Sequence, residues 1–375
     1  MIKVVQTSLG KASSNKHPSR HFQGPPTRTA VLAKPAKISL PTDENLVVLQ
    51  IGTRRVKLTN LQKPFWPELR ITKGELLQYY ADVAPVLLPH LIDRAMVMKR
   101  YPQGAFGPFF FMKRAPVPRP DLVELCSIAH SSGNVIGFPV VQDLATLLWI
   151  VNLGCIDLNP WYARCDDVDR PDYLHFDLDP VEGTKFATVR RVALRVRDGL
   201  GALGMTSLVK TSGSTGLHIY VPIVRGPMQK QLWSLAKQFA QGMEGLHPKI
   251  ITAEYRVAKR PAGRVLVDYN QNEWGRTLAS VYSVRPRPRA TVSMPVTWEE
   301  ISDGAEPHDF HLRNARERIA RVGDLWKPLL AARGRFKLER LWTAAEAKQS
   351  PARRAKSEDA KHPGKPKRRA RRSKS

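Results

Sequence analysis

Residues 173–180 have the sequence YLHFDLDP, in which apolar and polar residues alternate until a proline ends the run. This pattern predicts a β-strand. Side chains two positions apart on a strand point to one face, so Asp177 and Asp179 should project together while Phe176 and Leu178 are buried. Paired carboxylates repel each other, and such oxygen ligands suit Mg²⁺ or Mn²⁺. A strand edge with two solvated acids is an alternative of equal weight on this motif alone.

A second motif follows at residues 208–222, LVKTSGSTGLHIYVP, where two short β runs flank a turn of Ser, Gly and Thr. Such a turn can present backbone N–H groups and hydroxyls to an anion, because glycine permits close approach. Lys210 and His218 add cationic or donor groups at its edges. The turn lacks the Walker pattern of a P-loop, and a plain hairpin turn is the alternative interpretation.

A third motif, RVLVDYNQN at residues 264–272, predicts another strand ending in an acid, Asp268. A third carboxylate on a separate strand would complete a two-metal site, which stabilises the attacking and leaving oxygens of a phosphoryl transfer. Farther along, Arg276 and Arg285 are placed to neutralise a leaving pyrophosphate.

The composition points to a polyanionic partner. The 375 residues contain 60 Lys and Arg against 33 Asp and Glu, a net charge of +27, and 42% are hydrophobic. Nucleic acid is the first candidate, with a ribosomal-type protein or a membrane-surface binder as alternatives. Neither a membrane-spanning run nor a signal peptide is evident, so we expect a cytoplasmic, nucleoid-associated protein. The cysteines show no spacing typical of disulfides or zinc sites: Cys126, Cys155 and Cys165.

Composition also divides the chain. No acid precedes Asp43, so the beginning of the chain is predicted to be a basic disordered arm, with a leader peptide as a comparable alternative. The predicted segments are a basic arm at 1–44, a globular domain at 45–330, a C-terminal helix at 331–350 and a basic disordered tail at 351–375. The tail should bind nucleic acid through phosphates.

Hydrophobic periodicity predicts the main elements of the globular part. They are a hairpin over 46–58 and helices over 143–152, 186–200, 228–243 and 319–330, with another near 338–347. Thr72 and Glu75 form a capping-box pattern that should begin a further helix. Lys63 and Lys73 bracket this helix start and could hold a phosphate, although spacing alone favours two solvated lysines.

Residues 107–114, GPFFFMKR, place three adjacent aromatic residues beside two cations. Exposed rings with nearby cations are typical of base stacking. The buried end of a strand is an equally weighted alternative.

The three motifs together resemble the polymerase domain of bacterial DNA ligase D, a member of the archaeo-eukaryotic primase superfamily used in end joining. The similarity covers residues 58–298. It rests on the Asp-x-Asp strand, the Ser-Gly-x-x-Gly-x-His turn that begins at Ser212, and the run from Val267 through Arg285. The resemblance implies an α/β (mixed α+β) fold with an archaeo-eukaryotic primase-like core, in which two sheets surround an acidic cleft.

The resemblance also implies roles for individual residues. The predicted catalytic and metal-binding residues are Asp177, Asp179 and Asp268, with Mn²⁺ favoured over Mg²⁺. The candidate nucleotide-binding residues, from the resemblance and from the spacing above, are Asn159, Lys210, Ser212, Thr215, His218, Gln271, Arg276 and Arg285. The candidate DNA-binding residues are Asn60, Lys63, Lys73 and Arg100 around a downstream 5′-phosphate, and Phe110 and Phe111 stacked against the template.

One position departs from the family pattern. Many ligase D domains have a histidine, which helps to orient the nucleotide, where this chain has Asn159. The run GCIDLNPW at 154–161 is more similar to stand-alone actinobacterial primase-polymerases implicated in short-gap repair. The sequence also lacks a Lys-x-Asp-Gly ligase motif, so ligation would require a separate DNA ligase, and Ku is a second candidate partner.

We therefore predict a template-directed polymerase of the primase-polymerase type that uses nucleoside triphosphates, ribonucleotides by preference. It would act at short gaps or broken ends of DNA, in end joining or gap filling. A non-catalytic module that binds DNA ends or gaps is the main alternative. A glycosyltransferase could also use an Asp-x-Asp motif, but the net charge and the third acidic strand fit it poorly.

Overall fold

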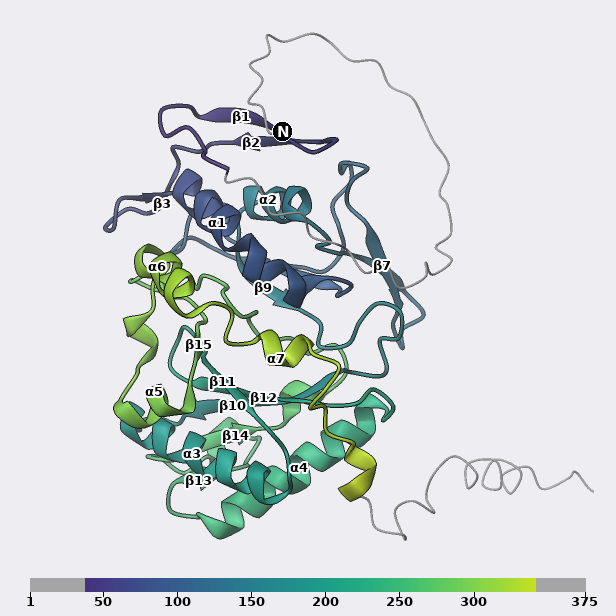
Figure 1. Cartoon of the computed structure of the whole chain (residues 1–375), viewed down its shortest axis with the longest axis vertical. Coiled ribbons are helices and arrows are strands. Elements are labelled where there is room, and N and C mark those ends of the chain that lie inside the picture. The colour runs from purple at the N-terminus through teal and green to yellow at the C-terminus, as the bar shows by residue number, and fades with distance from the viewer. Residues whose placement is uncertain (1–37, 342–375) are drawn as a thin grey trace, which may run out of the picture. The chain divides into compact units, whose positions relative to one another are not determined.

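The computed structural model describes residues 38–341 (Figure 1). The chain divides into two compact units, 1–336 and 337–375. In the second unit the described part includes a single 3-10 turn, η4 (Leu338–Leu341). The helix predicted over 331–350 is wrong at its start, because residues 331–337 are not helical, and residues 342–350 and the basic tail lie outside the described residues. The basic arm also lies outside them except for 38–44, where Ile38 and Leu40 are buried. Packed sequence therefore begins before residue 45.

The larger of the sheets is built around the Asp-x-Asp strand. In sheet order its six strands are β13 (Ile251–Thr252), β14 (Val265–Asp268), β10 (Tyr173–Pro180), β12 (Leu217–Pro222), β11 (Leu208–Thr211) and β15 (Pro295–Val296). All neighbours are antiparallel except β13 and β14. The register places Asp177 opposite His218 on β12 and opposite Asp268 on β14. All three sequence motifs thus meet on adjacent strands.

Two amphipathic helices pack against this sheet, α3 (Phe186–Ala202) and α4 (Gln229–Leu246). Figure 1 shows them together, on the side of the sheet away from the N-terminal elements. On α3 the buried positions Val189, Val192, Val196 and Leu200 recur every three or four residues, which is the stripe that the sequence predicts.

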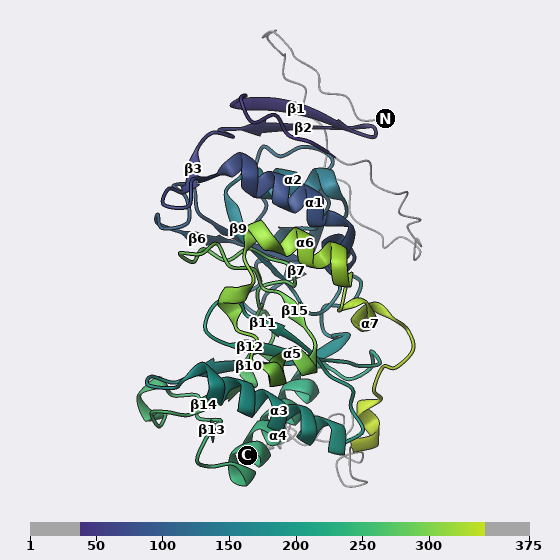
Figure 2. The same cartoon turned by 60° about the vertical axis from the view of Figure 1, so that its left-hand side comes forward.

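A second, three-stranded sheet lies on the N-terminal side, in the order β6 (Phe110–Met112), β5 (Met96–Arg100) and β9 (Cys155–Pro160). Both views place the helices α1 (Lys73–Leu91) and α2 (Leu144–Asn152) beside it (Figures 1 and 2). Three short antiparallel pairs complete this side: β1 (Leu46–Ile51) with β2 (Arg54–Thr59), β3 (Pro64–Trp66) with β4 (Ile71–Thr72), and β7 (Leu125–Ala129) with β8 (Val135–Pro139). The predicted capping box is confirmed, since Thr72 and Glu75 each accept the other's backbone N–H.

The C-terminal elements of the first unit are short. They are η1 (Val257–Lys259), η2 (Asn270–Asn272), α5 (Trp298–Asp303), η3 (Pro307–Asp309), α6 (Leu312–Val322) and α7 (Lys327–Leu330). The prediction of one helix over 319–330 is wrong. Gly323 adopts a φ of 70° after α6, and the Asp324 carboxylate accepts the backbone N–H of Trp326, so the chain turns before α7 begins. Within residues 38–341, none of the helices is both apolar enough and long enough to span a bilayer.

A buried ion pair links the segments that lead into the two sheets. Arg94 precedes β5 and Asp172 precedes β10, and both are almost fully buried. The Nη2 atom of Arg94 donates to both carboxylate oxygens of Asp172, at 2.7 and 2.8 Å, and Arg164 Nε donates to one of them at 3.0 Å. Removal of the carboxylate would leave two guanidinium groups without their shared partner.

We predict that Asp172→Ala lowers the free energy of unfolding by about 3–5 kcal/mol, because breaking a buried ion pair leaves an uncompensated buried charge. Urea denaturation measures this change. The matched control is Asp198→Ala, which removes an exposed pair with Arg197 and should cost less than about 1 kcal/mol. Equal losses in the two variants would contradict the assigned role of Asp172.

Candidate active site

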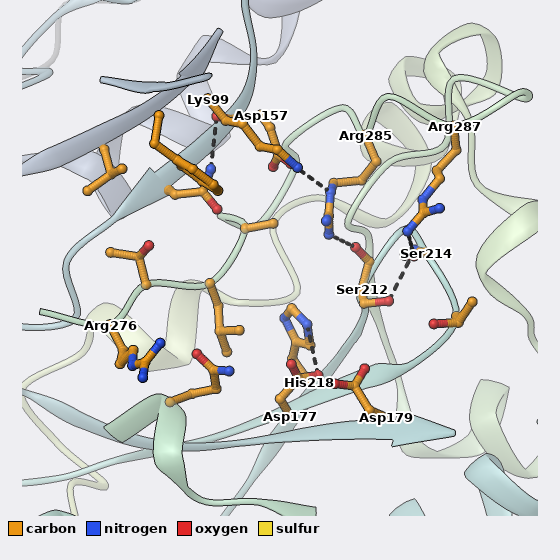
Figure 3. Close-up of a pocket in the computed structure, with 18 of the residues that line it drawn as sticks. Lys99, Asp157, Asp177, Asp179, Ser212, Ser214, His218, Arg276, Arg285 and Arg287 are labelled. Carbon is orange, nitrogen blue, oxygen red and sulfur yellow. Dashed lines mark hydrogen bonds and ion pairs between the residues drawn. The ribbon is translucent and has the colours of Figure 1, made fainter. Parts of the chain in front are cut away.

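A cavity of about 510 Å³ lies between the six-stranded and the three-stranded sheets. Asp177, Asp179 and His218 form one wall, and Lys99 and Asp157 lie across from them (Figure 3). The two sheets thus enclose a cleft, as the resemblance implies, and its acidic side is the wall formed by β10. The predicted site residues that line the cavity are Phe111, Asn159, Asp177, Asp179, Ser212, Thr215, His218, Gln271, Arg276 and Arg285, whereas Asp268 does not line it.

Both carboxylates on β10 have a raised proton affinity. Burial, and then the neighbouring Asp268, raise the pKa of Asp177 to about 7. The pKa of Asp179 is also raised to about 7, first by the charge of Asp177 and then by burial. Asp177 Oδ1 is buried and finds no hydrogen-bond partner among the described residues, although His218 Nε2 lies 3.3 Å away. Strand register thus holds together groups that repel each other.

This donor set fits a divalent cation. Two close carboxylates with an unpartnered buried oxygen are relieved by such an ion, and carboxylate oxygens are the ligands that Mg²⁺ and Mn²⁺ prefer. Asp268 is differently engaged, since its two oxygens accept the backbone N–H of Asn270 at 2.8 Å and the Gln271 amide at 2.9 Å. Among residues 38–341 no group of three or more His, Cys, Asp or Glu side chains is ready-made for a metal. The fit therefore rests on the Asp177–Asp179 pair.

The turn between β11 and β12 packs tightly because of its glycines. A Cβ added to Gly216 would lie 2.1 Å from the Leu178 carbonyl oxygen on β10, and one added to Gly213, whose φ is +66°, would lie 2.6 Å from Arg285 Cγ. The Ser212 hydroxyl itself accepts the N–H groups of Ser214 and Gly216, at 3.1 and 3.0 Å. Two of the backbone N–H groups expected to face an anion are thus hydrogen-bonded within the turn. The turn therefore presents hydroxyl groups to the cavity.

Arg285 connects the turn to the opposite wall. Its Nη1 atom donates to the Ser212 carbonyl at 2.5 Å, and its Nε atom lies 3.3 Å from Asp157 Oδ2 (Figure 3). Arg276 is exposed and pairs with Glu273 at 3.4 Å. Both arginines line the same cavity, so the site combines an acidic wall with cations that face it.

Sequence reasoning missed several residues of the cavity, namely Lys99, Asp157, Ser214 and Arg287. Asp157 precedes Asn159 by two positions on β9, so strand alternation could have assigned it to the same wall. Arg287 donates to the Ser214 hydroxyl at 2.5 Å. That contact joins segments 73 residues apart, and no local sequence pattern indicates it.

Lys210 does not lie where the sequence predicts. Its side chain is fully buried behind His218, and it does not line the cavity, so it has no direct access to a nucleotide. Alternation along β11 puts Lys210 on the same face as its cross-strand neighbour His218. The prediction failed because alternation does not show whether other segments close over that face.

The candidate DNA-binding cations come together near the start of α1. The pKa of Lys73 is lowered to about 8, mainly by burial and then by the charges of Lys63 and Arg100. Lys73 Nζ donates to the Thr59 carbonyl at 2.6 Å and to Asn152 Oδ1 at 2.8 Å, so it is fixed rather than solvated. Asn60 is exposed in the turn before Lys63, with a φ of 56°. The arrangement is a cluster of cations that repel one another.

The aromatic rings of β6 are exposed, which rules out the alternative of a buried strand end. Phe110 is 43% exposed and Phe111 is 59% exposed. The guanidinium carbon of Arg100 lies 5.2 Å from the Phe110 ring centre, and Lys99 Nζ lies 5.6 Å from that of Phe111. Exposed rings flanked by cations are suited to stacking with bases.

We predict that Asp179→Asn stabilises the metal-free protein more at pH 8 than at pH 5. The fold raises the pKa of Asp179 from 3.8 to about 7, so folding is favoured when the carboxyl is protonated. This contribution to stability is fully present below pH 3.8 and is lost as the pH rises through about 7, where Asp179 ionises in the folded protein. The amide removes that repulsion, by an amount on the order of 1 kcal/mol at pH 8. Thermal unfolding in EDTA at both pH values measures it, with Asp198→Asn as the exposed control. A difference from the unmutated protein that does not change with pH would refute the account.

Comparisons with known proteins agree with this architecture. The family model described as the LigD primase-polymerase domain matches residues 72–326. The multifunctional non-homologous end joining protein LigD of Mycolicibacterium smegmatis is 35% identical over 279 residues, which are 73% of this chain and 36% of that protein. The bifunctional LigD of Bacillus subtilis is 28% identical over 270 residues, 72% of this chain and 43% of that protein. The chain thus spans less than half the length of these relatives.

A solved structure is also similar. The polymerase domain of Mycobacterium tuberculosis ligase D, in complex with DNA, superimposes with a TM-score of 0.70 at 33% sequence identity, covering 74% of this chain and 99% of that one. The similarity extends over nearly all of that solved domain. Fold, motif order and sequence agree, and the chain belongs to the LigD primase-polymerase domain family.

Proposed function

We propose that the chain is a template-directed nucleotidyltransferase, a DNA repair polymerase that adds nucleotides at short gaps or broken ends. The observation that supports this best is the meeting of Asp177, Asp179 and the Ser212–His218 turn in one cavity, opposite cations of a second sheet. The similar proteins are named as end joining proteins and as a polymerase domain bound to DNA. Nucleoside triphosphates are the proposed substrates, and Ku and a separate DNA ligase are the proposed partners.

In this proposal the residues of the cavity have two roles, since the carboxylates hold cations and other polar side chains bind the triphosphate. The carboxylates of Asp177 and Asp179, with Asp268 beside them, would hold Mn²⁺ or Mg²⁺. Such ions stabilise charge on the attacking and leaving oxygens of a phosphoryl transfer. The triphosphate would lie against the hydroxyls of Ser212 and Thr215, the ring of His218 and the guanidinium of Arg285, all of which line the cavity. These donors face the side on which negative charge develops.

Asn159 and Gln271 would orient the nucleotide. Asn159 donates its amide N–H to the Asp157 carbonyl at 3.0 Å, so the side chain is held against the wall of β9. The Gln271 amide is held by Asp268. A preference for ribonucleotides is part of the proposal, and the ratio of ribonucleotide to deoxyribonucleotide incorporation tests it.

The cation cluster at the start of α1 would bind the 5′-phosphate on the far side of a gap. Burial, and then the charges of Lys63 and Arg100, lower the pKa of Lys73. A phosphate dianion would relieve the repulsion among these three cations. The exposed Phe110 and Phe111 would stack on template bases beside this site. The net charge of +27 favours such a polyanionic partner.

We predict that Asp177→Ala abolishes templated extension of a primer on a gapped duplex with Mn²⁺, a loss on the order of 1000-fold, because a cation ligand and its charge stabilisation are removed. Binding of the gapped DNA, measured by fluorescence anisotropy, should stay nearly unchanged. The control is the exposed variant Asp198→Ala. Full extension by Asp177→Ala would refute the catalytic assignment, and tight gap binding without incorporation by the unmutated protein would favour the non-catalytic alternative.

We also predict that Lys63→Ala weakens the preference for a 5′-phosphorylated gap by about tenfold, because it removes a half-buried cation whose Nζ contacts Gln103 at 3.2 Å. Competition between phosphorylated and unphosphorylated gaps measures the preference. The matched control is Lys57→Ala, which removes an exposed lysine on β2 and should weaken binding of both duplexes equally. Equal binding of the two duplexes by the unmutated protein would remove the basis of the assignment.

A further inference from the structure

The buried amine of Lys210 is satisfied by three partners from three parts of the chain. Its Nζ atom lies 2.7 Å from His218 Nδ1, 3.0 Å from the Ala279 carbonyl oxygen and 2.5 Å from Ser293 Oγ. The side chain has no exposed surface. Burial of an amine costs free energy, and an apolar residue of similar volume would avoid that cost. Packing alone therefore does not account for a lysine at this position.

The hydrogens of this cluster can be assigned by counting donors and acceptors. The Ala279 carbonyl can only accept, and Ser293 Oγ donates its own hydrogen to the Thr211 carbonyl at 2.9 Å, so it accepts from Lys210. The third hydrogen of the ammonium group then points to His218 Nδ1. That nitrogen is an acceptor, and the ring hydrogen of a neutral imidazole must lie on Nε2.

The surroundings of the ring and of the amine bear on the same assignment. His218 Nε2 lies 3.3 Å from Asp177 Oδ1 and on the cavity side of the ring (Figure 3). A neutral amine at Lys210 would use its two hydrogens on Ala279 and Ser293 and would take the ring hydrogen on Nδ1. Burial lowers the pKa of Lys210, whereas the ring of Trp326, whose centre lies 5.8 Å from Nζ, favours the charged ammonium over the neutral amine.

We propose that Lys210 is a positioning residue that keeps His218 in the Nε2–H tautomer. The ring then presents a hydrogen-bond donor to the cavity, instead of a lone pair that would repel a phosphate oxygen. This deepens the proposed function, because it rests on the assignment of the His218 side of the cavity to the triphosphate. It also explains why a lysine with no access to the nucleotide lies directly behind a residue that lines the site. Hydrogen bonds from behind fix the tautomer of metal-bound histidines in a comparable manner.

The first test needs no ligand, metal or activity. Nitrogen-15 NMR of the full chain distinguishes the two neutral tautomers of histidine, and the loss of one signal set in His218→Gln assigns the resonances. The expected result is a protonated Nε2 and an unprotonated Nδ1 in the unmutated protein. A protonated Nδ1 would overturn the proposal while leaving the polymerase assignment, which depends on Asp177, untouched.

The second test uses Lys210→Met, which keeps the bulk of the side chain and removes the donor. We expect the Nε2–H population of His218 to fall and the KM for a nucleoside triphosphate to rise about tenfold, with a smaller change in kcat. In a His218→Gln background the same substitution should add little, because an amide has no tautomer to fix. An unchanged tautomer and KM in Lys210→Met would show that the lysine is only structural. If that variant does not fold, the spectrum of the unmutated protein still decides.

Discussion

Repulsion between carboxylates is the constraint on which the rest of this molecule depends. Antiparallel register places Asp177 opposite Asp268, and strand alternation adds Asp179 to the same face. Burial and mutual charge hold the pKa values of Asp177 and Asp179 near 7. Bringing these groups together costs stability, so their arrangement argues for a function that uses them.

The wall opposite these carboxylates carries positive charge and extends to the exposed aromatic rings. Arg285 contacts both the turn before β12 and Asp157 on β9, which ties the two sheets together across the cavity. Lys99 lies 4.0 Å from Asp157 Oδ2 and 4.2 Å from the centre of the Phe109 ring. One lysine thus adjoins the cavity and the exposed aromatic rings.

The features that sequence predicts well are those that depend on local periodicity. The Asp-x-Asp strand, the capping box at Thr72 and the buried stripe of α3 all follow from patterns a few residues long. The features it predicts poorly depend on distant segments. Lys210 is enclosed by Ala279 and Ser293, about 70 and 80 positions downstream, and Ile38 and Leu40 are held through hydrogen bonds to Gln78. Since no local pattern records such contacts, neither position could be placed from sequence.

A titration of Mn²⁺, monitored by the electron paramagnetic resonance signal of the free ion with and without a nucleoside triphosphate, tests directly whether Asp177 and Asp179 bind a divalent cation. We expect the protein to bind Mn²⁺, protons to be released on binding near pH 7, and both effects to disappear in Asp177→Ala. Binding of Mn²⁺ that is equally tight in the variant, or no binding even with the nucleotide present, would contradict the claim that this acidic face is the cation site of a polymerase.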